Sequence, residues 1–340
     1  MSDTPEFWWH RHHIAAWLLA PVGLAYGALA GARMGRAGRM TDLPIVCIGN
    51  FVVGGAGKTP VAIAVAEACR RVGRQPAFLT RGYGGSERGP LLVQEKNQTA
   101  DQVGDEPLLL ARHAATVVAA DRLAGARLIS ELGHDIIVMD DGFQNPSIRK
   151  DLSLIVVDGG AGIGNGWPLP AGPLRASLGT QLRATDAVVL LGEGEAGQVA
   201  VRRAARAAVP VLSARFEPVR KRGFRTRRYM AFAGIGRPQK FYDSLEKAGV
   251  HVDLTVDFPD HHAYSEDDCR VLLDLARDRS LTPMTTEKDW VRLGSAGEAG
   301  GELLDLAEQF PVKVRFEEER RLDNMISEML TRRPIETRSD

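Results

Sequence analysis

I-V-C-I-G-N-F-V-V-G-G-A-G-K-T, at residues 45–59, sets the fold class of this 340-residue chain. Its apolar beginning, residues 45–48, predicts a buried strand, and Pro60 with the apolar residues after it predicts a helix that has proline in its first turn. A strand, a glycine-rich loop and a helix in this order are typical of a phosphate-binding loop. The segment therefore predicts a polyphosphate site in an α/β fold.

The residue types in this loop explain how it would bind a nucleotide. The predicted nucleotide-binding residues are Gly54, Gly55, Ala56, Gly57, Lys58 and Thr59. The glycines allow backbone N–H groups to converge on an anion at a helix N-terminus, which adds partial positive charge. Lys58 would reach the β- and γ-phosphates, and Thr59 would bind Mg²⁺. Val52 stands where the G-x-x-x-x-G-K-T pattern has its first glycine.

Composition narrows the class of protein. Hydrophobic residues make up 44% of the chain and charged residues 25%, as in ordinary globular proteins. The 43 lysines and arginines balance the 43 aspartates and glutamates, so no nucleic-acid partner is expected. The three cysteines have no metal-ligand spacing and fit buried thiols in a reducing compartment.

The first 40 residues concentrate aromatic side chains, and residues 14–32 carry no charge. This run is long enough to span a bilayer, but Pro21 and three glycines interrupt it. A cleaved signal peptide fits poorly, because Asp3 and Glu6 precede the apolar run. We favour an interfacial helix or helical hairpin, with arginines near anionic lipid. A helix packed on the protein's own core is the alternative.

Predicted strands and helices alternate after the phosphate loop, which indicates a mainly parallel sheet with helices on both faces. The strands are predicted at residues 76–80, 116–120, 135–139, 152–157, 186–191 and 209–214. Beyond an arginine-rich junction, further strands at 229–234, 252–256, 282–286 and 312–316 predict a second, smaller α/β unit. The expected organisation is an interfacial segment (1–40), a P-loop core (41–217) and a C-terminal α/β domain (218–340).

Two acidic pairs stand at predicted element ends. Asp140 and Asp141 follow the apolar strand at 135–139, and such a strand downstream of a phosphate loop holds Mg²⁺ in P-loop enzymes. Strand alternation sends the two side chains to opposite sides, so the pair allows two distinct roles. Asp105 and Glu106, in G-D-E-P, begin a predicted helix. They either cap it, or Asp105 acts as a general base or metal-side carboxylate at the carboxyl edge of the sheet.

Two loops offer further candidate residues. Arg81 and Tyr83, in R-G-Y-G-G, follow a predicted strand and offer a cation and an aromatic ring to a sugar or phosphate, or the segment is only a tight turn. Residues 165–175, N-G-W-P-L-P-A-G-P-L-R, contain too much Pro and Gly for a helix or strand. Long rigid loops of this kind tend to be functional, and Arg175 suits an anionic group.

The C-terminal half adds two polar segments. His261 and His262 follow D-F-P-D in a predicted loop, where a surface position is the common alternative to catalysis. T-E-K-D at residues 286–289 partly matches the guanine-reading motif T-K-x-D, with its lysine one position late. This partial match favours GTP slightly.

Seven motifs follow the apolar N-terminal segment in order: G-N-F-V-V-G-G-A-G-K-T-P, R-G-Y-G-G, G-D-E-P, D-D-G-F-Q, L-P-A-G-P-L-R, D-H and T-E-K-D. Together they closely resemble the tetraacyldisaccharide 4'-kinases of lipid A biosynthesis, over nearly the whole chain. The loop of that family also lacks the first glycine, so Val52 agrees with it.

The resemblance implies an ATP- and Mg²⁺-dependent kinase on the cytoplasmic face of the inner membrane, held there peripherally or monotopically. It would transfer the γ-phosphoryl group of ATP to the 4'-hydroxyl of a tetraacylated glucosamine disaccharide 1-phosphate. That membrane lipid and the inner-membrane surface are the implied partners, and no obligatory protein partner is expected.

The resemblance also implies residue roles. The implied catalytic residues are Lys58, Asp105 and His261, with Asp105 as the base and His261 as its partner from the second domain. The implied metal ligands are Thr59, Glu106 and Asp140. The motifs that line the substrate side contribute Arg81, Tyr83, Asp141, Gln144 and Arg175. Two choices stay open: His261 or His262 as the partner of Asp105, and Asp140 or Asp141 at the metal.

Two other classes explain part of the sequence. A membrane-anchored switch-type or metallochaperone P-loop ATPase or GTPase would share the loop and the doubled aspartate. Its signature lysine is expected at position 53, where this chain has Val53. A non-enzymatic membrane scaffold would explain residues 1–40 but not the phosphate and magnesium ligands.

Overall fold

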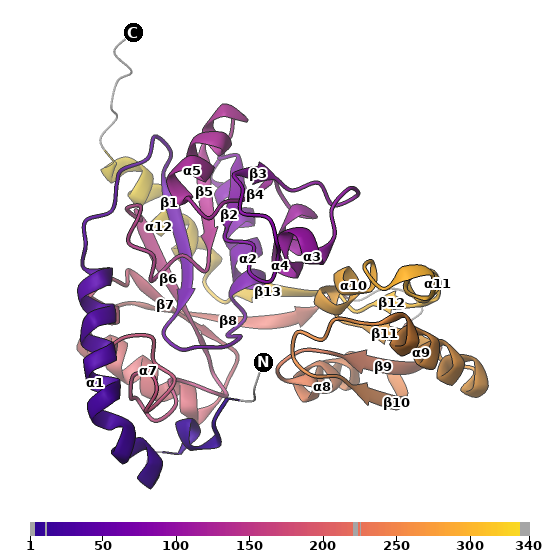
Figure 1. The fold of residues 1–340 in the computed structure, drawn as a ribbon. Helices are drawn as coiled ribbons and strands as arrows, with labels where there is room; N and C mark the ends of the chain where they lie inside the picture. The colour runs from indigo at the N-terminus through magenta and orange to yellow at the C-terminus, as the bar shows by residue number, and fades with distance from the viewer. Residues whose placement is uncertain (1–3, 11, 220–223, 225, 334–340) are drawn as a thin grey trace.

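The computed structural model of the protein describes residues 4–10, 12–219, 224 and 226–333. The described residues form a nine-stranded sheet and a four-stranded sheet. Figure 1 shows a large body around the first sheet and a small body around the second. An apolar helix near the N-terminus lies along one side of the large body. The predicted α/β class is confirmed, with a mainly parallel main sheet and a smaller second unit.

The large sheet has the strand order β13-β8-β7-β6-β1-β5-β2-β4-β3. Its strands are β1 (Ile45–Asn50), β2 (Pro76–Thr80), β3 (Leu91–Leu92), β4 (Thr116–Val118), β5 (Ile136–Asp140), β6 (Leu152–Asp158), β7 (Ala187–Leu191), β8 (Val211–Pro218) and β13 (Val312–Phe316). Neighbouring strands are parallel except at the two edges, where β3 and β13 run antiparallel to β4 and β8.

The sequence of β1 explains its central place, because all six of its residues are buried. Val46 and Ile48 belong to the core on one face of the sheet, and Ile45 and Cys47 belong to the core on the other. The covering helices are α2 (Lys58–Arg71) and α12 (Glu319–Arg332) on the first face, and α5 (Arg122–Glu131), α6 (Leu178–Arg183) and α7 (Glu195–Arg206) on the second. A parallel strand covered on both faces needs this continuous apolar run.

The small sheet is entirely parallel, with the order β10-β9-β11-β12. Its strands are β9 (Arg228–Ala233), β10 (His251–Asp257), β11 (Thr282–Thr285) and β12 (Glu308–Gln309). Its helices are α8 (Pro238–Ala248), α9 (Glu266–Arg279), α10 (Glu287–Leu293) and α11 (Gly297–Leu306). One core lies under α8 and another under α9 and α11, so helices again cover both faces.

One strand was expected in the wrong unit. Residues 312–316 were predicted to belong to the second α/β unit, but β13 pairs with β8 in the large sheet, and Val314 and Phe316 enter the core beside α2. Sequence order cannot reveal this return, since an antiparallel edge strand is defined by a partner about 100 residues away. The chain therefore passes between the bodies twice, through the adjacent strands β8 and β13 (Figure 1). Division into domains at 40 and 217 remains a proposal.

Helix α1 (Ile14–Met34) follows a short 3₁₀-helix, η1 (Glu6–Trp9), and docks on the large body through small residues. The buried residues of α1 are Ala16, Ala20, Gly23 and Gly27. A Cβ atom on Gly27 would lie 2.8 Å from Cγ of Pro168, and one on Gly23 would lie 2.8 Å from the Pro168 carbonyl oxygen. The close approach therefore requires glycine, and it places α1 against the proline-rich loop at residues 165–175.

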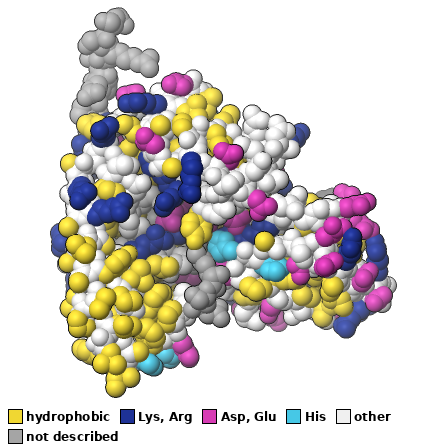
Figure 2. Space-filling model, in the orientation of Figure 1, with side chains coloured by type: hydrophobic (Ala, Val, Ile, Leu, Met, Phe, Trp, Pro, Cys, Tyr) yellow, Lys and Arg dark blue, Asp and Glu magenta, His cyan; other side chains and the backbone are white. Residues whose placement is uncertain are grey.

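The opposite side of α1 is apolar and uncovered. Its exposed large side chains are Ile14, Trp17, Leu18, Val22, Leu24, Tyr26 and Leu29. Figure 2 shows hydrophobic side chains gathered at the lower left of the molecule, where α1 lies in Figure 1. Among the described residues, α1 is the helix long and apolar enough to cross a membrane. An uncovered apolar face of this size marks an interaction surface.

The packing of α1 predicts that Gly27→Leu destabilises the protein. The larger side chain would overlap Pro168, and overpacking of this kind costs about 1–3 kcal/mol of unfolding free energy. Thermal unfolding in detergent should show a lower midpoint for Gly27→Leu. Leu18→Ala, at a position that is 76% exposed, should unfold like the wild type. Equal midpoints for Gly27→Leu and wild type would contradict the docking.

Candidate active site

The phosphate loop joins β1 to α2 and is held in shape by its own contacts. The Asn50 side-chain amide donates a hydrogen bond to the Gly54 carbonyl across the loop, at 3.0 Å. Gly57 has φ +80° and immediately precedes α2. A Cβ atom there would lie 2.4 Å from a methyl group of Leu191, so both backbone and packing require glycine. The loop thus presents its N–H groups at the N-terminus of a 14-residue helix.

Thr59 and Asp140 meet at the start of α2. Parallel pairing aligns Ile48 of β1 with Asp140 of β5, so both strands end at the same edge of the sheet. The Thr59 hydroxyl donates to Asp140 Oδ2 at 2.9 Å. The other carboxylate oxygen, Oδ1, is buried without a hydrogen-bond partner. A buried, unpartnered carboxylate oxygen beside a threonine hydroxyl has the chemistry of a divalent-cation site.

The electrostatics of Asp140 support the same conclusion. Burial and the negative charge of Glu106 raise its pKa to about 7, against the opposing effect of Lys58. A cation at this place would relieve both the desolvation and the repulsion. The described residues contain no cluster of three or more His, Cys, Asp or Glu side chains around one point. P-loop magnesium sites differ from such clusters, because a hydroxyl, one acid and the nucleotide phosphates hold the ion.

Asp141 turns away from Asp140 and faces two cations. Its backbone adopts φ +52°, and its Oδ2 lies 3.7 Å from the Lys58 ammonium and 3.5 Å from the Arg175 guanidinium. Lys58 is thus paired with Asp141 in this structure. The two neighbouring aspartates therefore have different partners: Asp140 accepts a hydrogen bond from Thr59, and Asp141 forms an ion pair with Lys58.

Gln144 and Arg175 contact the backbone that enters the phosphate loop. The Gln144 amide donates to the Asn50 carbonyl at 2.8 Å, and Arg175 Nε donates to the Val52 carbonyl at 3.2 Å. Arg175 Nη1 also donates to Gln144 Oε1 at 3.3 Å. Both residues therefore support the loop in this structure, and their predicted contact with substrate stays a proposal.

The R-G-Y-G-G segment after β2 leaves Arg81 and Tyr83 exposed, with Tyr83 at 59%. Its glycines permit close packing on the short helix α3 (Ala100–Val103), because a Cβ atom on Gly85 would lie 2.6 Å from the Gln102 carbonyl oxygen. The turn therefore presents a cation and an aromatic ring to solvent near the start of α4 (Asp105–Ala111).

Asp105, the first residue of α4, lies at the contact between the two bodies. Its Oδ1 accepts from the backbone N–H of Glu106 at 2.9 Å. Its Oδ2 accepts from Nε and Nη2 of Arg292, a residue of α10 in the small body, with the Nε contact at 2.9 Å. Lys288, one turn earlier on α10, lies 3.3 Å from Glu106 and 3.7 Å from Asp105. The acids of G-D-E-P are therefore paired with cations from the other body.

The charge state of Asp105 follows from these neighbours. Burial opposes its ionisation, but the hydrogen bond with His261 and the charges of Lys288 and Arg292 outweigh burial and hold its pKa well below the usual range. Asp105 is consequently an ionised carboxylate at neutral pH.

His261, and not His262, faces Asp105. His261 Nδ1 lies 3.6 Å from Asp105 Oδ2, and its backbone adopts φ +59°. His262 points away, with Nε2 3.0 Å from Asp268 and its ring stacked on Phe258. The structure thus distinguishes the two adjacent histidines: His261 lies next to Asp105, and His262 pairs with Asp268.

Sequence reasoning overlooked Arg292 and misjudged the T-E-K-D segment. Thr286 caps α10, and Lys288 is paired with Glu106 and Asp105, so the segment contributes to the contact between the bodies. Lys288 and Arg292 are four residues apart and lie on one face of a helix. In the sequence, this four-residue spacing could have indicated two basic side chains that pair with Asp105 and Glu106.

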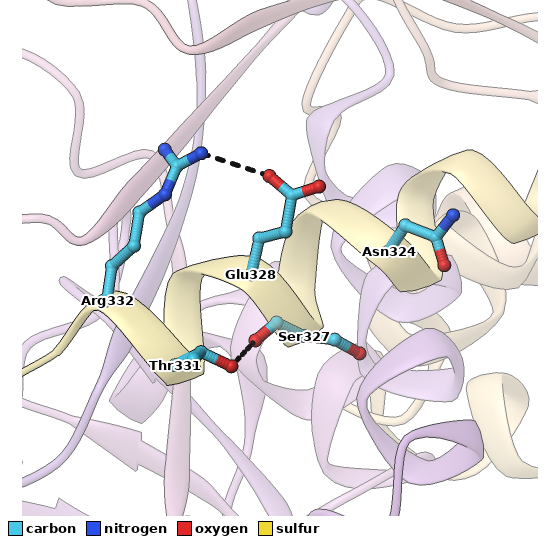
Figure 3. A pocket seen from close by; sticks show the side chains of 5 residues that line it. All are labelled: Asn324, Ser327, Glu328, Thr331 and Arg332. Carbon is cyan, nitrogen blue, oxygen red and sulfur yellow. Dashed lines mark hydrogen bonds and ion pairs between the residues drawn. The ribbon is translucent and has the colours of Figure 1, made fainter.

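A shallow depression elsewhere on the surface is not part of this site. Figure 3 shows it along α12, lined by Asn324, Ser327, Glu328, Thr331 and Arg332. Arg332 pairs with Glu328 at 3.1 Å, and the Thr331 hydroxyl donates to the Ser327 carbonyl at 2.9 Å. These polar groups are satisfied within one helix, on the side opposite its buried residues.

Comparisons with known proteins find chains of similar fold and sequence. A solved structure of LpxK from Aquifex aeolicus in complex with ATP matches the fold with a TM-score of 0.72, at 24% identity, over 93% of this chain and 99% of that chain. Tetraacyldisaccharide 4'-kinases from Methylobacterium sp. (strain 4-46) and Brucella anthropi are 52% and 45% identical to this chain. The two alignments cover 86% and 98% of this chain, and 89% and 98% of the relatives.

The family model described as LpxK, tetraacyldisaccharide-1-P 4'-kinase, matches residues 15–331. The match includes both bodies, the phosphate loop, the acids of G-D-E-P and D-D-G-F-Q, and the histidine loop. With this coverage and with relatives at 45–52% identity over most of its length, the chain belongs to the tetraacyldisaccharide-1-P 4'-kinase family.

Proposed function

We propose that this protein transfers the γ-phosphoryl group of ATP to the 4'-hydroxyl of a tetraacylated glucosamine disaccharide 1-phosphate, which forms the 4'-phosphate of lipid A. Two observations carry the proposal: the phosphate loop has Thr59 hydrogen-bonded to Asp140, and Asp105 of the same body lies 3.6 Å from His261 of the small body. Family membership names the acceptor, and the Aquifex relative is described in complex with ATP. A membrane-anchored switch ATPase or GTPase is disfavoured by that membership.

The loop residues would bind and orient the triphosphate. Lys58, now 3.7 Å from Asp141, would move its ammonium to the β- and γ-phosphates when ATP enters. Residues 54–57 would direct backbone N–H groups at the same oxygens. Phosphoryl transfer depends on positioning and on neutralising charge more than on covalent chemistry, so these contacts would supply much of the rate enhancement.

Mg²⁺ is proposed at Thr59 and Asp140, with Glu106 close by. The unpartnered Oδ1 of Asp140 and its raised pKa both suit a divalent cation at this place. When bound, Mg²⁺ would offset the negative charge that the phosphates carry during transfer. Glu106 is paired with Lys288 in this structure, so it would approach the metal after that pair opens.

Asp105 is proposed as the base that receives the proton of the acceptor hydroxyl. An ionised carboxylate is ready to accept a hydrogen bond from that hydroxyl, and a base in this position typically contributes about 10²- to 10⁴-fold. His261, 3.6 Å away, is its proposed partner. The substrate-side residues Arg81, Tyr83, Asp141, Gln144 and Arg175 are proposed to contact the sugar or its phosphate.

The membrane location is proposed from α1. Acyl chains hold such an acceptor in the bilayer, so the enzyme must work at the membrane surface. The small-residue side of α1 is occupied by the protein and its large apolar side chains are exposed, which suits a helix lying in the interface of the inner membrane, on the cytoplasmic side where ATP is available. Basic residues beyond its C-terminus suit anionic headgroups.

The kinase proposal predicts that Lys58→Ala abolishes lipid phosphorylation. The assay follows transfer of labelled γ-phosphate from ATP to an extracted disaccharide 1-phosphate lipid in detergent micelles. Lys247→Ala, at an exposed position on α8, should retain wild-type activity. ATP hydrolysis by the wild type without labelled lipid would instead indicate a switch ATPase.

The base assignment predicts that Asp105→Asn lowers kcat by about 10²- to 10⁴-fold, because the amide cannot accept a proton. ATP affinity, measured by equilibrium binding, should stay within about threefold, since the phosphate loop is untouched. Loss of ATP binding in this variant would argue for a metal-side role of Asp105.

The membrane proposal predicts that the double change Leu18→Glu and Leu29→Glu releases the protein from membranes. Both side chains are more than 70% exposed on α1, and each charge would oppose burial in the acyl region. Vesicle flotation measures the bound fraction. Val271→Glu, at an exposed apolar position on α9, is the matched control and should bind normally. Unchanged flotation of the double variant would rule out α1 as the anchor.

A further inference from the structure

Arg292 is the most connected side chain at the contact between the two bodies. All of its nitrogen atoms are engaged: Nε and Nη2 with Asp105 Oδ2, Nη1 with the Gly234 carbonyl at 2.7 Å and with Asp289 Oδ1 at 2.9 Å, and Nη2 also with His261 Nδ1 at 3.2 Å. Only 6% of its surface is exposed. The guanidinium therefore touches both members of the proposed catalytic pair.

The Gly234 carbonyl ties this guanidinium to the histidine loop. It accepts from Arg292 Nη1 and from the backbone N–H of His261, the latter at 3.1 Å. His261 is held in the left-handed region, which a non-glycine residue adopts only where its surroundings require it. One carbonyl group thus sets the position of the His261 backbone relative to the guanidinium that holds Asp105.

The guanidinium also lies against the His261 ring. Its Nη2 donates to Asp105 Oδ2 and lies 3.2 Å from His261 Nδ1. His261 Nδ1 is in turn 3.6 Å from Asp105 Oδ2. One nitrogen of Arg292 therefore contacts the ring and the carboxylate at the same time.

Stability alone does not account for this arrangement. Buried ion pairs contribute little net stability, because desolvation offsets their attraction, and apolar replacements are often equally stable. Here two carboxylates, Asp105 and Asp289, and one guanidinium are all buried. A cluster of this kind is better explained by the geometry that it imposes on the groups it touches.

We propose that Arg292 is a positioning residue for the transfer reaction, which holds the Asp105 carboxylate and the His261 ring together across the two bodies. This inference rests on the proposed role of Asp105 as the base. Arg292 contacts Asp105 and His261 at the same time. This double contact needs the planar guanidinium of arginine, which the single ammonium of lysine cannot reproduce.

A double-mutant cycle tests the proposal on the full-length enzyme in detergent. The variants are Arg292→Lys, Asp105→Asn and the combination, assayed for kcat, for KM of ATP and for thermal unfolding. Arg292→Lys should lower kcat by about tenfold to a hundredfold, as misplaced catalytic groups do, with KM for ATP within about twofold. The combined variant should be no slower than Asp105→Asn alone, because Arg292 acts through Asp105.

Arg277→Lys is the matched control. Arg277 pairs with Asp274 and Glu302 on the exposed surface of the same body, so its variant should have wild-type kinetics. A wild-type kcat for Arg292→Lys would overturn the proposal, and so would losses that multiply in the combined variant. Full activity of Asp105→Asn would instead overturn the base assignment itself.

A second variant keeps the test decisive if Arg292→Lys does not fold. Asp289→Asn keeps the shape of the side chain that accepts from Arg292 Nη1 but removes its charge. It should lower kcat severalfold with unchanged KM for ATP. Wild-type kcat in this variant would count against positioning by Arg292.

Discussion

The parallel pairing of β1 with β5 is the constraint on which the candidate site depends. The register that aligns Ile48 with Asp140 brings the end of the Walker-type acid strand next to the start of the phosphate loop. From this register follow the hydrogen bond between Thr59 and Asp140 and the nearness of Lys58 to Asp141. A shift of this register by one residue would turn Asp140 and Asp141 to the opposite faces of the sheet and separate Asp140 from Thr59. Continuous burial on both faces of β1 makes such a shift costly.

Ion pairs connect the small body to the large body, in addition to the backbone. The backbone passes between the bodies at β8 and β13, and two acidic residues of the large body form ion pairs with basic residues of the small body. Asp105 pairs with Arg292, and Asp158 at the end of β6 pairs with Lys240 and Arg237 beside α8. These ion pairs join the two bodies next to the residues proposed for catalysis.

The apolar helix α1 is connected to the phosphate loop through the proline-rich loop at residues 165–175. Gly23 and Gly27 of α1 lie on the loop at residues 165–175, and Trp8 donates its indole N–H to the Pro170 carbonyl at 3.0 Å. The far end of that loop contacts the phosphate loop, where the Val53 N–H donates to the Pro173 carbonyl at 2.9 Å. The residues at 165–175 thus contact both the glycine side of α1 and the phosphate loop. These contacts give a proline-rich stretch without helix or strand defined partners on both sides.

Local patterns in the chain were enough for the α/β class, the phosphate loop, the acid-bearing strand and the apolar helix, because each depends on residues close in sequence. The order of short motifs was also enough for the family. Pairing across long separations was not accessible in this way: β13 was expected in the wrong unit, Arg292 went unnoticed, and His261 could not be distinguished from His262. Those features arise from groups about 100 residues or more apart that meet only when the chain has folded, as Asp105 and Arg292 do. Sequence thus determined which chemical groups the protein carries, and folding decided which of them face one another, because burial and charge pairing act through space and not along the chain.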